Sequence, residues 1–269
     1  MQDKDINPIK MPSTWSELKT RCSYESYIGK SDCLVVTATN NSCVDGVIGM
    51  IKSFQLNADL DVEFLVLAKD ISKNNAGRLE SLYNTRVNHL LRHNANDHWC
   101  TWILEIFFLK NLADYEYVFY VDADIMVLKP LHEFLRIFDI KPEDRVCVVD
   151  HKRVWHKEWF YRDNHNFNAG FIVFKGTFFN HTDHKALCKD ILRAKPTNDE
   201  KYLRWFFNKK RLLYAPTKFN GRIIWLNERA VHEDDVYVVH FVGQEHKPWK
   251  KNCQAKHMWL KKWRAIYNS

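Results

Sequence analysis

Two carboxylates stand one residue apart in this chain, Asp122 and Asp124, directly after a strongly apolar run. The residues Tyr117–Val121 predict a core strand, and apolar residues resume at Ile125. A carboxylate beside a core strand costs free energy unless something positive compensates it. Because open α/β sheets bind ligands at the carboxyl ends of strands, the pair indicates a site for Mg²⁺ or Mn²⁺. The alternative is a solvated turn that is acidic by chance.

Two further polar segments lie where predicted strands end or begin. Thr37–Asn40 follows one strand and precedes a helix, so its hydroxyl and amide groups could meet a nucleotide. An ordinary helix N-cap explains the same residues. Phe167–Gly170 contains small residues that permit close backbone approach, and Asn168 offers both a donor and an acceptor. The alternative for this segment is a plain turn that leads into a strand.

The third and fourth segments add charge. Asp199 and Glu200 begin a predicted helix, a place that the helix dipole favours for acidic residues in any case. His240 closes a late strand and is followed by Gly243 and by Lys247 in a Lys-Pro-Trp sequence. These could supply a metal ligand, a backbone amide and a phosphate-binding ammonium. A lone histidine is more often structural, but this combination favours a site.

Alternating strand and helix patterns must position these residues. Strands are predicted at 33–37, 62–67, 86–91, 117–121, 146–149, 171–174 and 236–240. Helices are predicted at 44–54, 74–83, 99–112, 131–138, 183–193 and 199–207. Strand and helix alternate through the first half, which is typical of an α/β doubly wound, Rossmann-like and mostly parallel sheet flanked by helices. We find no linker, so a single domain is expected.

Composition sets broad limits. The 269 residues are 46% hydrophobic, and the formal charge of +7 suits an anionic partner without choosing among nucleotides, nucleic acid and membrane. The seven cysteines are odd in number and form no C-x-x-C pair, as expected for reduced thiols. We see neither a signal-peptide core nor an apolar stretch of membrane-spanning length. These features predict a cytoplasmic protein, peripheral to the membrane at most.

The two ends of the chain differ from the middle. Residues 1–30 are polar and aperiodic and predict a lead-in, residues 31–250 predict the catalytic domain, and residues 251–269 predict a basic aromatic helix. On that helix Trp259, Trp263 and Ile266 share one face, which lysines flank. The face could rest on a membrane surface or pack on the domain, and the sequence leaves both open.

Together these segments resemble the family 8 glycosyltransferases, the group that contains glycogenin and the bacterial lipooligosaccharide galactosyltransferases. The resemblance covers roughly residues 32–250. It rests on motifs in the family's order: Thr37–Asn41 with Gly46 and Ser53, Tyr120–Asp124, Asp150, Phe167–Gly170, Asp199–Leu203, Lys218–Asn220, and Val239–Gly243 with Lys247–Trp249.

The resemblance implies a GT-A fold, a nucleotide-sugar donor that is usually UDP-linked, Mn²⁺ (or Mg²⁺), and retention at the anomeric carbon. It implies Asp122, Asp124 and His240 as metal ligands. Donor and diphosphate contacts would come from Thr37, Ala38, Thr39, Asn40, Asp122, Ala123, Asp124, Asn168, Ala169, Gly243 and Lys247. The candidate catalytic residues beside the sugar are Asp150, Asp199 and Glu200.

This chain departs from the family at four places. Cys43 stands where relatives often have an aromatic residue over the uracil, and Glu105 stands where a basic residue is usual. Glu200 replaces a frequent glutamine. The interval from His240 to Lys247 is one residue longer than usual, so His246 could compete with Lys247 for the phosphate.

Retention requires either a carboxylate nucleophile, Glu200 or Asp199, or attack on the same face as the leaving diphosphate, and the sequence does not decide between them. A glycan, glycolipid or protein acceptor is expected, and no nucleic acid. One alternative is a sugar-nucleotide nucleotidyltransferase, although the segment after the first strand has neither the glycine nor the basic residue that such enzymes normally show. The other alternative is a non-catalytic basic protein that binds membranes or nucleic acid.

Overall fold

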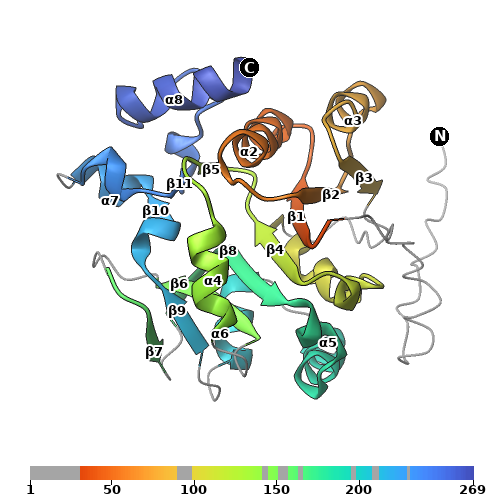
Figure 1. Cartoon of the computed structure of the whole chain (residues 1–269). Coiled ribbons are helices and arrows are strands. Elements are labelled where there is room, and N and C mark those ends of the chain that lie inside the picture. Colours follow the sequence, from red (N-terminus) through yellow and green to blue (C-terminus); the bar gives the residue numbers. More distant parts are fainter. Residues whose placement is uncertain are drawn as a thin grey trace, which may run out of the picture.

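An eight-stranded mixed sheet forms the centre of the fold, with strand order β3-β2-β1-β4-β8-β6-β9-β7 (Figure 1). The computed structural model describes residues 31–89, 99–140, 145–150, 157–162, 166–194, 198–207, 212–228 and 231–269. The lead-in predicted at 1–30 lies outside these residues.

The first half of the chain builds the parallel part of the sheet. Its elements are β1 (Cys33–Thr39), α2 (Val44–Asn57), β2 (Val62–Ala68), α3 (Lys73–Glu80), β3 (Thr85–His89), the 3₁₀ helix η1 (Trp99–Phe108) and β4 (Tyr117–Val121). β1 pairs in parallel with both β2 and β4, and β2 pairs in parallel with β3. The predicted order is confirmed. The helix expected at 99–112 is instead a 3₁₀ helix that ends at Phe108, and residues 90 and 91 of the predicted third strand lie outside the described residues.

The second half makes the sheet mixed. Its elements are α4 (His132–Asp139), β6 (Val146–Asp150), β7 (Phe160–Arg162), β8 (Phe167–Lys175), η3 (Gly176–Asn180), α5 (Thr182–Ala194), α6 (Asp199–Phe207) and β9 (Leu212–Ala215). β8 runs antiparallel to both of its neighbours, β4 and β6. The segment Phe167–Gly170, expected to precede the strand predicted at 171–174, is the first part of β8 itself.

A second sheet of three short strands pairs β11, from the last part of the chain, with β5, which directly follows β4. Its order is β10 (Gly221–Arg222), β11 (Val238–His240) and β5 (Ile125–Val127), and α7 (Ile223–Glu228) follows β10. The strand predicted at 236–240 is therefore shorter than expected. β5 and β10 were not predicted, because a strand of two or three residues shows no periodicity of its own.

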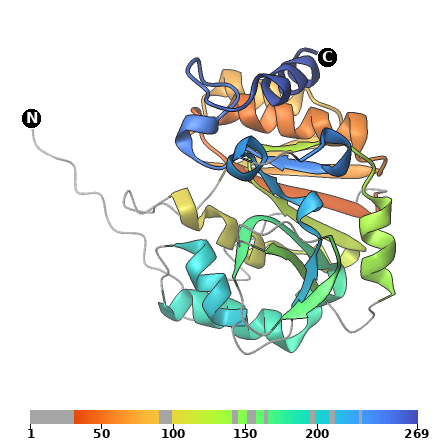
Figure 2. The ribbon, with the colours of Figure 1, turned by 90° about the vertical axis from the view of Figure 1, so that its left-hand side faces the viewer.

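Helices cover both faces of the large sheet (Figure 2). On one face, side chains of η1, η3, α5 and α6 pack on Leu34, Val36 and Val118. On the other face, α2, α3 and α4 pack on Val35 and Phe119. Because successive residues of a strand point to opposite faces, strands buried on both sides read as continuous apolar runs.

The C-terminal helix α8 (His257–Asn268) lies against α2 (Figure 1). Trp259 and Trp263 are buried in a third apolar cluster that includes Met126 of β5. A Cβ added to Gly49 of α2 would lie 2.6 Å from Nε1 of Trp263, so the glycine allows the indole to approach. The two indoles therefore face the protein, so of the two readings that the sequence left open the structure supports packing of this face on the domain.

No helix within the described ranges is both long and apolar enough to cross a membrane. Five cysteine side chains are described, and all are free thiols, namely Cys33, Cys43, Cys147, Cys188 and Cys253. This agrees with the reduced thiols that the cysteine pattern predicts.

Candidate active site

Asp122 and Asp124 occupy the turn that joins β4 of the large sheet to β5 of the small one. The amide of Asp122 donates to Gly170 O at 2.9 Å, and the amide of Ile125 donates to Asp122 O at 3.2 Å, which closes the turn. The turn lies at the carboxyl end of β4, next to β1. Strand order reverses between these two strands, and α/β sheets bind ligands at such a point.

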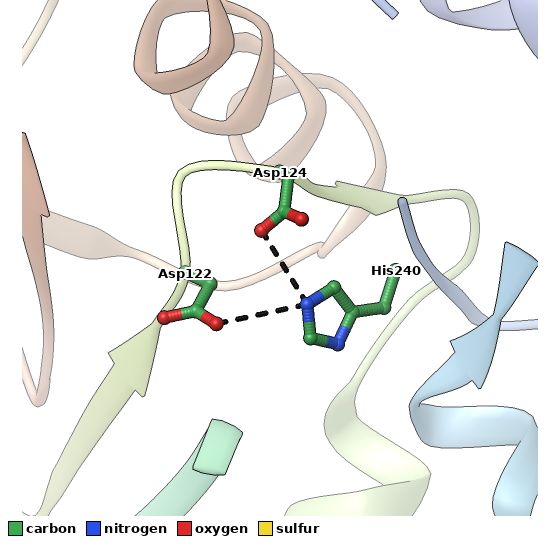
Figure 3. A group of neighbouring side chains, drawn as sticks. All are labelled: Asp122, Asp124 and His240. Carbon is green, nitrogen blue, oxygen red and sulfur yellow. Dashed lines mark ion pairs between the residues drawn. The ribbon is translucent and has the colours of Figure 1, made fainter. Parts of the chain in front are cut away.

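His240 reaches the carboxylates because β11 pairs with β5. The pairing is antiparallel and places His240 opposite Ile125, and the amide of Phe241 donates to Asp124 O at 2.9 Å. His240 Nε2 lies 3.4 Å from Asp124 Oδ1 and 3.6 Å from Asp122 Oδ2 (Figure 3). Asp124 and His240 lie about 116 positions apart in the sequence, and they meet because two short strands, β5 and β11, pair with each other.

These three side chains fit a divalent cation. One ligand atom from each can be chosen such that all lie within 4.8 Å of one another. Two carboxylate oxygens suit Mg²⁺ or Mn²⁺, and an imidazole nitrogen suits transition metals better than Mg²⁺. The donor set therefore favours Mn²⁺.

Lys247 supplies positive charge at the same place. Its Nζ forms an ion pair with Asp124 Oδ2 and donates to Phe241 O at 3.2 Å. Burial lowers the pKa of an ammonium, yet the Asp124 carboxylate outweighs it and holds the pKa of Lys247 above its usual range. Lys247 is therefore a permanent cation beside the candidate metal site.

The two aspartates differ electrostatically. Burial alone would raise the pKa of Asp124, but Lys247 and His240 outweigh it and hold that pKa below its usual range. Burial and the negative charge of Asp124 raise the pKa of Asp122, although Tyr120 donates its hydroxyl to Asp122 Oδ1 at 2.7 Å. Two carboxylates this close repel one another, and a bound cation would remove that repulsion.

Glu200 is held by partners on two elements. Its Oε2 accepts from Asn168 Nδ2 at 3.3 Å and from the Ala169 amide at 3.4 Å, and its Oε1 pairs with Arg204 one helical turn later. Arg204 in turn donates from Nε to Phe167 O at 2.7 Å. The start of α6 and the start of β8, predicted as separate clusters, therefore form one site.

Asp199 and Asp150 lie at the edges of this site. Asp199 is partly buried at the start of α6, where burial and the charge of Asp122 raise its pKa to about 7. Its Oδ1 accepts from the Glu200 amide at 2.6 Å. Asp150 is the last residue of β6, where its backbone pairs with Phe167. Its side chain lies outside the described part of the structure.

The segment predicted to meet the nucleotide lies on the strand next to β4. Thr37 and Thr39 are buried in β1, Ala38 is half-buried, and Asn40 follows the strand. Thr37 Oγ1 has no hydrogen-bond partner among the described residues. Asn40 Oδ1 accepts from the amide of Ser42 at 3.0 Å, which closes a turn before the helix. The N-cap of α2 is Cys43, which makes no side-chain cap hydrogen bond, so the N-cap alternative is wrong for this segment. No described contact joins this segment to the metal group.

The loop after β11 separates its two basic side chains. Gly243 has φ +97°, a conformation that favours glycine, and its carbonyl accepts from the His246 amide at 3.3 Å. His246 is buried with Nδ1 2.9 Å from Val242 O, whereas Lys247 lies on Asp124. Trp249 donates to Ser42 O at 3.2 Å and covers Gly46 at the start of α2.

Sequence reasoning assigned no role to three residues that hold the site together. They are Tyr120, Arg204 and Asn220. Tyr120 and Asn220 belong to recognisable motifs, but a motif does not say which group its side chain contacts. Arg204 follows Glu200 by four residues, the spacing of a helical ion pair, and that spacing is the signal that could have identified it.

Comparison with known proteins agrees with this geometry. Residues 33–253 match the family described as Glycosyl transferase family 8. No curated protein matches the chain.

Solved glycosyltransferases with the GT-A fold share this architecture. The galactosyltransferase LgtC, in complex with donor and acceptor sugar analogs, is 20% identical with a TM-score of 0.64, and the match covers 87% of this chain and 95% of LgtC. The glycosyltransferase GlyE of Streptococcus pneumoniae TIGR4 is 16% identical with a TM-score of 0.61, over 87% of this chain and 63% of GlyE. Mouse xyloside xylosyltransferase 1 is 11% identical with a TM-score of 0.52, over 80% and 99% of the two chains.

These likenesses show the fold, and the family match covers most of the chain. The family match excludes the nucleotidyltransferase and the non-catalytic alternatives. The chain is therefore a glycosyltransferase with a GT-A fold, and it belongs to glycosyl transferase family 8.

Proposed function

We propose that this enzyme transfers a hexose from a UDP-sugar to a glycan, glycolipid or protein acceptor, depends on Mn²⁺, and retains the configuration of the anomeric carbon. One observation carries the proposal: Asp122, Asp124 and His240 converge at the carboxyl end of β4, with the ammonium of Lys247 beside them. Oxygen and imidazole ligands next to a lysine suit a cation that is shared with a diphosphate.

The donor lies across the strand ends in this proposal. Thr37, Thr39 and Asn40 on and after β1 face the uridine, and the unpaired hydroxyl of Thr37 is one group that a ligand could satisfy. Cys43, at the start of α2, offers no aromatic surface for the uracil. Affinity for the base then depends more on hydrogen bonds than on stacking.

The reaction breaks the bond between the anomeric carbon and a diphosphate oxygen and forms a bond from that carbon to an acceptor hydroxyl oxygen, whose proton passes to the leaving diphosphate. Asp122, Asp124 and His240 would hold the Mn²⁺, which would supply a Lewis acid for the negative charge on the leaving diphosphate. Lys247 adds a fixed positive charge on the same side, and its ion pair with Asp124 keeps it there before the donor arrives. Because these charges are already placed, little reorganisation accompanies bond cleavage.

Glu200 orients the sugar in this proposal and is not the nucleophile. Both of its oxygens already have partners, Arg204 on one and Asn168 with the Ala169 amide on the other. A carboxylate held in this way is a poorer nucleophile than an unpaired one, but its negative charge still stabilises the positive charge that develops on the sugar. Same-face attack by the acceptor therefore accounts better for retention.

A screen of UDP- and GDP-sugars for Mn²⁺-dependent hydrolysis and thermal stabilisation tests the proposal. EDTA should abolish turnover and Mn²⁺ should restore it. Asp122→Asn and Asp124→Asn should each lose most of the activity and keep the fold. The matched control is Asp234→Asn, because the Asp234 side chain is 76% exposed and lies outside the site. Full activity of the chelated wild-type protein would refute metal dependence.

A further inference from the structure

We propose that Asn220 is a positioning residue that fixes the tautomer of His240 and links that ligand, through Asn168, to Glu200. The inference rests on the proposed metal-dependent function, and it assigns a role to a side chain that contacts the metal ligand His240 and the donor-site residue Asn168 but is itself neither a metal ligand nor a donor contact. Asn220 is 1% exposed and ends the 3₁₀ turn η4 (Thr217–Phe219), directly before β10. The parallel pairing of β10 with β11 brings it beside His240.

Three hydrogen bonds join the metal ligand His240 to Glu200 on the sugar side of the site, and a fourth holds Asn168 in place. His240 Nδ1 lies 3.0 Å from Asn220 Oδ1. Asn220 Nδ2 donates to Asn168 Oδ1 at 3.2 Å, and Asn168 Nδ2 donates to Glu200 Oε2 at 3.3 Å. The fourth bond runs from the Gly170 amide to Asn168 Oδ1 at 3.0 Å. Both asparagines and His240 are buried, so the hydrogen bonds between them are shielded from solvent.

The direction of every bond follows from the Gly170 amide. A backbone N–H can only donate, so the atom of Asn168 that it meets must be the carbonyl oxygen. The Asn220 atom that faces this oxygen must then be the amide nitrogen. The other end of Asn220 is therefore its oxygen, which accepts from His240. The carboxylate of Glu200, which accepts from Asn168, is consistent with the same direction.

The hydrogen bond with Asn220 leaves one neutral tautomer for His240. Because Asn220 presents an acceptor, the neutral imidazole carries its proton on Nδ1, and the lone pair of Nε2 points toward Asp122 and Asp124. That is the form a metal ligand needs, and a partner on the second ring nitrogen is the usual means of fixing it. Asn220 also holds Asn168 so that its amide nitrogen faces Glu200.

Two substitutions separate positioning from packing. Asn220→Ala removes both hydrogen bonds, whereas Asn220→Asp keeps an acceptor for His240 and loses the donor to Asn168. We expect Asn220→Ala to weaken Mn²⁺ binding by about 10- to 100-fold, as the loss of the hydrogen-bond partner of a ligating histidine commonly does. Asn220→Asp should bind Mn²⁺ within a few-fold of wild type yet lose donor turnover. Asn57→Ala is the matched control, because it removes an asparagine whose side chain donates to the backbone carbonyl of Val127, outside this path.

Two measurements decide the inference. The first is a titration of Mn²⁺ into the full chain without donor, in which electron paramagnetic resonance measures Mn²⁺ binding. The second is nitrogen NMR of histidine-labelled, metal-free protein in alkaline buffer, with the His240 signal identified among the 13 histidines by its loss in His240→Gln. The wild-type protein should show the proton on Nδ1.

A proton on Nε2, or unchanged Mn²⁺ affinity in a folded Asn220→Ala protein, would overturn the inference. If Asn220→Ala does not fold, the wild-type NMR signal and the Asn220→Asp titration still decide it. Failure of the wild-type protein to bind Mn²⁺ would instead refute the metal dependence of the proposed function, while the NMR signal would test the hydrogen-bond path on its own.

Discussion

Gly170 lies against the imidazole of His240, so that a Cβ at Gly170 would be 2.2 Å from Cε1 of the ring and 2.7 Å from Asp122 Oδ2. The two residues come from different sheets, β8 of the large one and β11 of the small one. The missing side chain at Gly170 is therefore what lets the two sheets place His240 and Asp122 around one point.

Gly170→Ala should weaken Mn²⁺ binding by at least about 10-fold, because the ring and the carboxylate must both move to make room for the methyl group. Titration of Mn²⁺ measures the effect. Gly77→Ala is the matched control, since nothing lies within 4 Å of a Cβ there. Gly77 is inside α3, so its substitution should leave Mn²⁺ binding unchanged and raise the free energy of unfolding by about 0.5–1 kcal/mol. Equal Mn²⁺ affinities for both variants would show that the close approach is unimportant.

Glu200→Gln should lower kcat by about 10- to 100-fold and leave measurable transfer, as expected for the loss of one electrostatic contact. The amide oxygen can still accept from Asn168, whereas the amide nitrogen cannot pair with Arg204. Measurement of kcat with metal and donor saturating tests this. Glu63→Gln is the control, because Glu63 of β2 also pairs with an arginine, Arg86, and accepts from Tyr115, and neither partner belongs to this site. Near-complete loss of transfer, or a glycosyl adduct on Glu200, would instead identify a nucleophile.

Asp199 should make the metal-free protein less stable as pH rises. Burial and the charge of Asp122 raise its pKa to about 7 in the folded protein, above its usual value of 3.8. Between pH 3.8 and about pH 7 the folded state therefore holds a proton that the unfolded state has already lost. The free energy of unfolding falls as pH rises through this range and levels off above it.

Urea unfolding in EDTA at about pH 5 and about pH 8 checks this effect. Asp199→Asn has no such proton to lose, so its free energy of unfolding should increase relative to that of wild type from the lower to the higher pH. Added Mn²⁺ should reduce the difference, because a cation near Asp122 offsets the charge that raises the pKa of Asp199. A constant difference between variant and wild type would contradict the assignment.

Trp263→Ala should lower the free energy of unfolding by about 3–5 kcal/mol, the range for a buried tryptophan. The indole is 5% exposed and fills the space above Gly49, so its removal leaves a cavity between α8 and α2. Met258→Ala on the same helix is the control, since Met258 is 38% exposed. Equal unfolding midpoints for the two variants in urea would show that α8 does not brace the domain.

The central strands of the large sheet were predictable because they are buried on both faces, whereas β7 (Phe160–Arg162) and β9 (Leu212–Ala215) were not predicted. Runs such as Val62–Leu67 and Tyr117–Val121 are apolar throughout, and the helices between them repeat at helical spacing. The small sheet was not predictable. β5 and β10 have three and two residues, too few for any pattern, and they are strands only because β11 lies between them.

The sequence by itself determined the residue types of the site and the strand ends on which most of them stand. A carboxylate pair after a buried strand is costly wherever it occurs, so local sequence is enough to indicate a cation. The tertiary structure alone decided which groups meet. The pairing of β11 with β5 set the distance from His240 to Asp124, and the approach of α6 to β8 joined Glu200 to Asn168. These contacts depend on strand register and on glycines that admit a neighbour, and neither is encoded in the spacing of residues along the chain.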